Sequence, residues 1–272
     1  MKRTVIGIVV VTGLTQVTGP AQAAPGVDPV KAVEAALQPG RTVTITSTAK
    51  TDHGRGLSYT TSADGTIGFG PQDEIAADLS QSIRFGKKAS KGMKDDLALA
   101  AMPLRIISSG EDDYVSGALV DAALPQEKRW VRYRATNLPA SNRLLDVLDK
   151  ATLRALVAHR TSWRDGVLRG TITTGELVKV SRPFVSRFGL RSKSGREGKV
   201  SYVLRLGPTG LVERLSAEAV LPFYDGSIRV EADTRYSGWG RRATVLLPRE
   251  GDVIDGEELG DELPYPLPGW VS

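Results

Sequence analysis

The sequence predicts a mostly β, α+β fold: a large curved antiparallel sheet, or half-barrel, with helices on its concave face. Alternation within Ile228–Tyr236 places apolar side chains on one face and charged ones on the other, so one face of the sheet is dry. A leucine-rich stretch from Leu144 to Val157 has helical spacing and is the sizeable element available to cover that face. Turn residues separate four alternating runs, which predict sequential antiparallel strands at Val200–Leu206, Leu211–Leu221, Ile228–Tyr236 and Arg241–Leu247.

A short helix is predicted to open the folded part of the chain. Asp28 is a favourable N-cap, Pro29 suits the first helical position, and Gln38-Pro39-Gly40 ends the helix after Leu37. The next segments are predicted to form a strand at Thr42–Ala49, a hairpin of Leu57–Ser62 and Thr66–Phe69 around Ala63-Asp64-Gly65, a short helix or loop at Asp73–Gln81, and a strand at Ser82–Gly86.

The middle of the chain combines short strands with the long helical pattern. Ser141 is the expected cap of that helix, and Asp149–Thr152 is a possible break into two helices. Glu176–Gly189 has no clear period and is interpreted as a mobile flap. Further strands are predicted at Pro103–Ile107, Tyr114–Val115, Arg129–Arg134 and Val167–Thr173.

The N-terminus predicts export. A basic start, the apolar stretch Val5–Leu14 and Ala21-Gln22-Ala23 form a signal peptide, residues 1–23, cleaved after about Ala23. Its retention as an N-terminal anchor is the alternative. Residues 24–256 are then expected to form one domain in an extracytoplasmic, cell-envelope location, followed by an acidic, proline-rich tail at 257–272. The absence of cysteine excludes disulfides, thiolate metal sites and a lipidated N-terminal Cys.

Charge is distributed unevenly around a net +5. Both signs are present and separated, which argues against a nucleic-acid partner, and we expect a monomer. A basic segment could make transient contact with an anionic membrane surface, although a solvated loop is the simpler interpretation. The basic residues of this segment are Arg182, Arg187, Arg191, Lys193, Arg196 and Lys199.

Catalytic signals are poor. The two histidines are His53, in a turn, and His159, at the end of the predicted helix, where a cap role is expected. The sequence has no G-x-S-x-G elbow, H-E-x-x-H pair or P-loop, and its acidic clusters lack an EF-hand layout. We therefore expect no enzymatic activity, no cofactor and no metal site.

The order of elements resembles the LolA/LolB/LppX-like superfamily of exported half-barrels, from about Val27 to Val253. Two departures stand out: the chain has no lipobox Cys, and no lid arginine can be matched, so no functional residue is transferred from the family. The segments that carry the resemblance are Asp113-Tyr114-Val115, Arg129-Trp130-Val131, Leu144–Leu148, Gly170-Thr171-Ile172-Thr173 and the stretch from Thr234 to Gly240.

The resemblance implies a hydrophobic cavity between sheet and helices. The chain is then expected to be a soluble binding protein that holds a lipid or lipoprotein acyl chain for envelope transport. The alternative is an RseB-like envelope sensor. Trp239, between two glycines, is expected to plug the rim of the sheet or to touch a partner. The candidate cavity-lining residues, each also an ordinary core residue, are Val43, Ile45, Ile67, Leu104, Ile106, Leu144, Leu148, Leu153 and Leu156.

Overall fold

The computed structural model describes residues 27–54, 57–70, 73–87, 98–110, 112–134, 144–188, 198–223 and 226–260. Its strands are β1 (Arg41–Asp52), β2 (Ser58–Gly70), β3 (Asp73–Phe85), β4 (Leu104–Ser109), β5 (Asp112–Ser116), β6 (Trp130–Arg134), β7 (Arg160–Arg164), β8 (Val167–Thr173), β9 (Lys199–Leu206), β10 (Val212–Phe223), β11 (Gly226–Arg242) and β12 (Val253–Asp255). Its helices are α1 (Pro29–Ala36), α3 (Ala118–Asp121), α4 (Lys150–Ala158), α5 (Thr174–Val180), α6 (Arg182–Phe188), the 3₁₀ turn η2 (Glu250–Asp252) and α7 (Gly256–Leu259).

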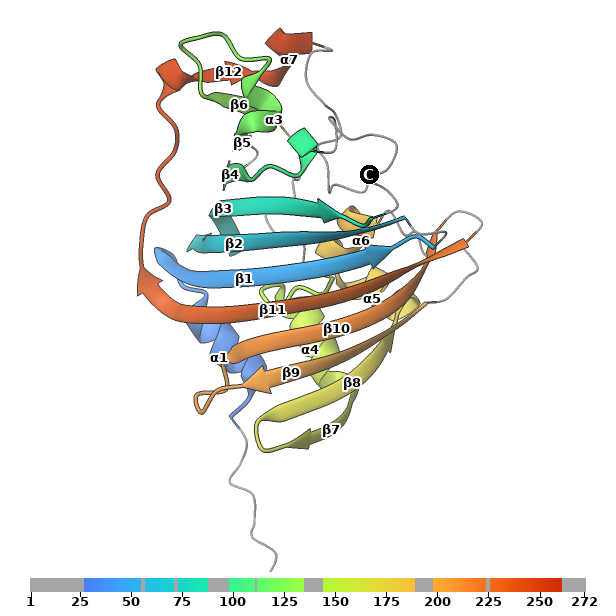
Figure 1. Ribbon diagram of the computed structural model, residues 1–272. Helices are drawn as coiled ribbons and strands as arrows, with labels where there is room; N and C mark the ends of the chain where they lie inside the picture. Colours follow the sequence, from blue (N-terminus) through green and yellow to red (C-terminus); the bar gives the residue numbers. More distant parts are fainter. Residues whose placement is uncertain are drawn as a thin grey trace, which may run out of the picture.

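The strands form one open sheet in the order β12-β6-β5-β4-β3-β2-β1-β11-β10-β9-β8-β7. Neighbours are antiparallel except β12, which runs parallel to β6. Figure 1 shows the sheet curving around α1, α4, α5 and α6, which lie on one side of it. The predicted mostly β, α+β fold with a large antiparallel sheet is confirmed.

The first helix follows the prediction closely. The Asp28 carboxylate accepts a hydrogen bond from the Val30 N–H at 2.9 Å, and Pro29 is the first helical residue. Leu37 is the C-cap. Val33 is fully buried, so this helix is held against the sheet by its apolar stripe.

The predicted hairpin around Ala63-Asp64-Gly65 is wrong, because β2 runs straight through these residues and pairs along its length with β3. Gly65 has φ 152°, and a Cβ there would collide with the Asp78 carbonyl oxygen of β3. Glycine therefore marks a close approach between two backbones within the sheet, and no turn is present. The short helix or loop predicted at Asp73–Gln81 is likewise wrong, since these residues belong to β3.

The long leucine-rich helix is present only in part. Asp149 caps α4, and its carboxylate accepts from the Thr152 N–H at 3.1 Å. The preceding residues, Leu144 to Asp149, form bends without regular structure, so helical spacing misidentified them. Their leucines are nevertheless buried. The proposed cap Ser141 lies outside the described residues.

Two further predictions are corrected in the C-terminal half. The expected flap at Glu176–Gly189 is largely built as α5 and α6; α5 begins with a capping box of Thr173 and Glu176. Residues 237–240, expected to be the turn between the predicted strands Ile228–Tyr236 and Arg241–Leu247, instead form a bulge inside β11. There, Thr42 and Thr44 of β1 pair with Arg241 and Ser237.

The fourth strand predicted at Arg241–Leu247 is therefore wrong. Arg241 and Arg242 complete β11, and residues 243–249 run without regular structure along one end of the sheet to η2, β12 and α7 (Figure 1). The helix α7 lies at the start of the stretch predicted to be an acidic tail. The predicted signal peptide, residues 1–23, lies outside the described residues.

The inner face of the sheet carries two separate hydrophobic clusters. The large core lies between β1–β3 and β8–β11 on one side and α1, α4, α5 and α6 on the other. The small core lies on β4–β6, under α3 and α7. Leu79 of β3 pairs with Ile106 of β4, so both cores occupy the same face. A third, small cluster of Ile107, Tyr114 and Val253 lies on the opposite face of β4 and β5.

Candidate functional site: the apolar interface between sheet and helices

The candidate site is the large core, where one face of the curved sheet meets the helices. Residues of β1 show how the sequence builds it: Val43 and Ile45 are fully buried, while Thr46, Thr48 and Lys50 point to the other face and are exposed. The same alternation recurs in β9 and β10. One side of these strands is consequently mostly apolar, with buried Ser47 and Thr51 among its residues.

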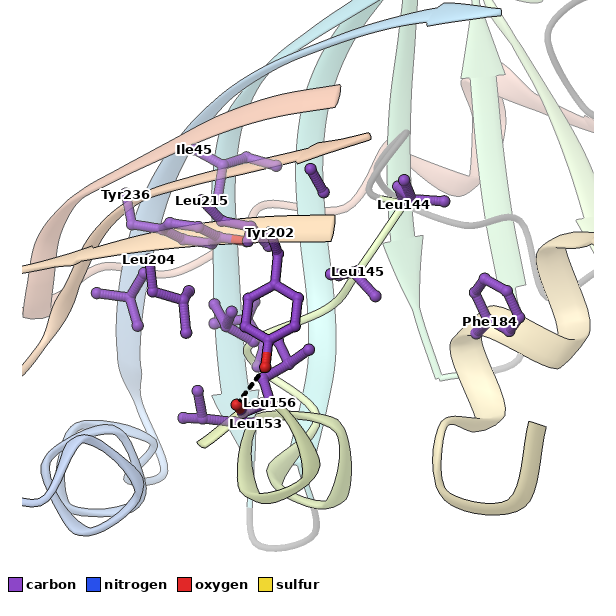
Figure 2. Packing of buried hydrophobic residues seen from close by; sticks show 14 of the residues in the cluster. Ile45, Leu144, Leu145, Leu153, Leu156, Phe184, Tyr202, Leu204, Leu215 and Tyr236 are labelled. Carbon is purple, nitrogen blue, oxygen red and sulfur yellow. Dashed lines mark hydrogen bonds between the residues drawn. The ribbon is translucent and has the colours of Figure 1, made fainter. Parts of the chain in front are cut away.

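Short elements cover this face. Leu153 and Leu156 of α4, Leu177 of α5 and Phe184 of α6 are each 2% exposed or less. Figure 2 shows Leu153 and Leu156 beside the ring of Tyr202, on the side of the sheet that carries Leu204 and Ile45. The irregular segment before α4 adds four more buried apolar side chains: Leu144, Leu145, Val147 and Leu148.

The structure divides the nine predicted lining residues between the two cores. Leu104 and Ile106 belong to the small core. All nine are 5% exposed or less, so in this state their side chains are covered by neighbours. Access to them requires part of the helical layer to move. The seven in the large core are Val43, Ile45, Ile67, Leu144, Leu148, Leu153 and Leu156.

A strip of small side chains crosses the inner face in the middle of the sheet. Register places Ala49 of β1 beside Ala232 of β11, and Ala232 beside Ala217 of β10. The next row contains Ala63, Ser47 and Thr234. Small side chains extend less far from the backbone, so they leave a shallow groove across the strands. Because protein interiors are close-packed, other side chains or a guest must fill this groove.

The hydroxyl groups in this strip do not make it polar. Ser47 Oγ and Thr234 Oγ1 hydrogen-bond each other at 2.8 Å, and both residues are 2% exposed or less. Thr61 Oγ1 donates to the Ala49 carbonyl oxygen at 3.2 Å. Because these donors and acceptors are satisfied within the sheet, the strip presents an effectively apolar surface.

Few directional contacts tie α4 to the sheet. The Tyr202 hydroxyl of β9 donates to the Leu156 carbonyl oxygen at 2.5 Å, drawn as a dashed line in Figure 2. Burial raises the pKa of Tyr202 to about 12, which keeps this donor protonated. Arg154 pairs with Glu34 of α1 at the exposed rim. Leu153 and Leu156 add apolar contacts between α4 and the core.

Helix α5 is positioned by its own cap. Thr173 donates its backbone N–H and hydroxyl to the Glu176 carboxylate at 3.0 and 2.9 Å, and these bonds hold the pKa of Glu176 below its usual value. His159, the C-cap of α4 as predicted, lies 3.4 Å from the other Glu176 oxygen. This solvent-accessible polar contact joins the end of α4 to the start of α5.

Trp239 plugs the rim of the sheet, the first of its two predicted roles. It is half-buried against the large core, stacks on Tyr236 at 5.8 Å between ring centroids, and donates its indole N–H to the Val212 carbonyl at 2.9 Å.

Sequence reasoning missed Tyr202 and the strip of small residues. Both follow from strand register, which joins residues far apart in the chain.

A hollow of about 650 Å³ lies on the outer face of the sheet, opposite the expected cavity. Polar and charged residues supply most of its lining. Two of the charged side chains are paired: Asp233 accepts from Arg214 and Ser216 at 2.8 and 2.6 Å, and Glu218 lies 3.3 Å from Arg229. The residues around it are Thr48, Lys50, Thr60, Thr161, Arg169, Gly170, Ser201, Tyr202, Val203, Ser216, Ala217, Glu218, Glu231, Ala232 and Asp233.

Within the described ranges, no group of three or more histidine, aspartate or glutamate side chains could hold a metal ion. In the same part of the chain, no helix has both the length and the apolar character needed to cross a membrane. His53 lies in the turn after β1, with its ring 5.8 Å from that of Tyr59.

Comparisons with known proteins give weak structural similarity. No protein-family model matches the chain, and no curated protein matches it. A LolA superfamily protein from Nitrosomonas europaea superposes with a TM-score of 0.27 at 9% identity, covering 80% of this chain and 93% of that one. MucB, in a complex with MucA, gives a TM-score of 0.11 at 6% identity, covering 79% and 94%.

A designed transmembrane β-barrel gives a TM-score of 0.21 at 5% identity, covering 73% of this chain and 97% of that one. The similarity is too weak to assign a ligand to the chain.

Proposed function

We propose that this chain is an exported, non-enzymatic binding protein that holds the acyl chain of a lipid or lipoprotein between its sheet and its helices. The observation that carries this proposal is the irregular segment at Leu144–Leu148. Its four apolar side chains are buried in the large core although the segment lacks regular structure, and the carboxylate of the fifth residue, Asp146, is also buried and accepts from the Leu148 N–H at 2.9 Å. A guest of similar shape and polarity can take the same place.

The energetics favour exchange of this cover for a guest. Apolar contacts have little directional preference, so those lost when the leucines leave are replaced by contacts with the guest. Burying an acyl chain gains about 0.8 kcal/mol per methylene, or on the order of 9 kcal/mol gross for twelve carbons. The strip of small residues supplies a path across the strands for an elongated chain.

Native mass spectrometry of the gently purified protein tests the proposal. We expect a population carrying the added mass of a lipid, and displacement of that lipid by a fluorescent long-chain fatty acid. A protein that is always empty and does not bind the fatty acid would contradict the proposal.

Leu148→Ala sharpens this test. Removal of the side chain leaves apolar space in the large core, at a stability cost of about 2–5 kcal/mol, and an apolar guest can fill that space. We expect tighter binding of the fatty acid. Leu119→Ala is the matched control: Leu119 is also buried, at 9% exposure, but in the small core, and should leave the affinity unchanged.

Ala49→Leu tests the strip of small residues by adding volume to it, whereas Leu148→Ala removes volume from the large core. A larger side chain there fills the strip and should weaken fatty-acid binding, with an overpacking cost of about 1–3 kcal/mol. Lys50→Leu, the next residue on the same strand, points to the outer face and should leave binding unchanged. Equal effects from both substitutions would remove the strip from the binding site.

A further inference from the structure

The segment from Arg241 to Arg249, which we call the strap, exposes two adjacent leucines. Leu246 is 74% exposed and Leu247 is 49% exposed. The strap links the centre of the sheet to its edge and forms the outer contour of the molecule at one end of the strands (Figure 1). Two neighbouring large apolar side chains in water are unfavourable unless they meet another surface.

The leucines are held outward because the chain is fixed on both sides of them. Before them, Val245 packs against the cluster of Ile107, Tyr114 and Val253. After them, the Arg129 N–H donates to the Asp252 carbonyl at 2.8 Å. The Lys128 ammonium donates to the carbonyls of Gly251 and Val253 at 3.0 and 2.8 Å.

Three exposed arginines frame the leucine pair: Arg241 and Arg242 before it, and Arg249 after it. None of them makes an ion pair with a carboxylate in the part of the chain that the structure describes. The acidic neighbour Glu250 lies 3.2 Å from Arg132 instead. The guanidinium groups are therefore available to phosphate oxygens.

We propose that the strap docks this protein on an anionic phospholipid surface. Leu246 and Leu247 enter the boundary between headgroups and acyl chains, while the three arginines contact lipid phosphates. A bilayer fits this small projection better than a folded partner, which needs about 800 Å² of surface on each side. The proposal goes beyond acyl-chain binding and does not depend on it, since an empty carrier would dock equally well.

Co-sedimentation of the full chain with vesicles tests the strap. We expect binding to phosphatidylcholine vesicles that contain phosphatidylglycerol, weakening as salt is added, and little binding to pure phosphatidylcholine. The double variant Leu246→Ser, Leu247→Ser should lower the partition coefficient by about tenfold or more. The triple variant Arg241→Gln, Arg242→Gln, Arg249→Gln should lower it comparably and remove the salt dependence.

Leu57→Ser is the matched control. Leu57 is 50% exposed and follows the Asp52 end of β1, whereas the strap starts at the opposite, Arg41 end. This variant should bind vesicles like the wild type. Far-ultraviolet circular dichroism verifies that each variant is folded.

Three outcomes of the vesicle assay would overturn the proposal. The wild type could fail to bind anionic vesicles, the leucine variant could bind as well as the wild type, or Leu57→Ser could reduce binding to the same extent. Sedimentation velocity tests whether the strap instead contacts a second copy of the chain. A dimeric wild type that becomes monomeric in the leucine variant would show such a contact. This result would also overturn membrane docking.

Discussion

The large and small cores share one face of one sheet but are closed in different ways. The large core is covered by α1, α4, α5, α6 and an irregular leucine-rich segment, mainly through apolar contacts. The small core is closed at the sheet edge by β12 and α7, where Arg132 donates to both Asp255 oxygens at 2.6 and 2.8 Å. Apolar cover can be exchanged for an apolar guest, whereas a paired charge resists separation from its partner.

The reverse faces of the two regions also differ. Behind the large core, the outer face is polar and exposed, as Thr48 and Lys50 illustrate. Behind the small core, Ile107 and Tyr114 are buried under Val253 and the strap. The small core is thus packed from both sides, and we expect it to be the rigid support on which the large core opens.

The largest effect is expected from Leu153→Ala. Leu153 is fully buried in α4, so the substitution leaves a cavity and should lower the free energy of unfolding by about 2–5 kcal/mol. Urea denaturation measures this loss. Leu57→Ala, at an exposed position, should change stability by about 0.5 kcal/mol or less. Similar losses in both variants would mean that α4 does not pack on the sheet as described.

A smaller effect is expected from Asp255→Asn, which removes the charged partner of Arg132. Asp255 is 29% exposed, so we expect a loss of about 1–2 kcal/mol. The loss should be local: amide exchange should accelerate in β12 and α7 and stay unchanged in α4. Faster exchange in α4 would show that the two regions do not open independently.

Acid should reproduce this change in the wild type. The Arg132 guanidinium holds the pKa of Asp255 below its usual value. The stabilisation is therefore complete above the unfolded pKa of about 4 and is lost as the pH falls below that value toward the folded pKa. The protection factors of the β12 amides, corrected for the intrinsic pH dependence of exchange, should fall over this range in the wild type, while Asp255→Asn should show no such step.

Tyr202→Phe should have the smallest effect on stability, about 1 kcal/mol, because it removes the hydrogen bond to the Leu156 carbonyl and keeps the ring. If that bond helps to hold the cover closed, the variant should bind a fatty acid more tightly than the wild type. Ser108→Ala, on β4 outside the large core, is the control and should leave affinity unchanged.

Local signals were sufficient to predict some elements and failed for others. Asp28 and Pro29 define α1 because a cap acts within one turn of its helix. The hairpin prediction at Ala63-Asp64-Gly65 failed because the sequence does not distinguish a glycine in a turn from a glycine where two strands approach closely. The full length of β11 was missed for the same reason. Gly238 and Gly240 were interpreted as turn residues, but they have positive φ inside a bulge of the strand.

The candidate site was harder to predict than the fold. Helical spacing of Leu144 and Leu148 correctly indicated burial but not backbone conformation, since a buried irregular segment needs apolar side chains as much as a helix does. The strip of small residues joins β1 to β10 and β11, and such non-local pairing leaves no signal in any one window.

Hydrogen exchange with and without a long-chain fatty acid tests most directly whether the large core is an exchangeable apolar site. We predict altered protection in Leu144–Leu148, α4 and α5, together with unchanged protection in β4–β6, β12 and α7. Unchanged protection throughout, or changes confined to the small core, would contradict the account.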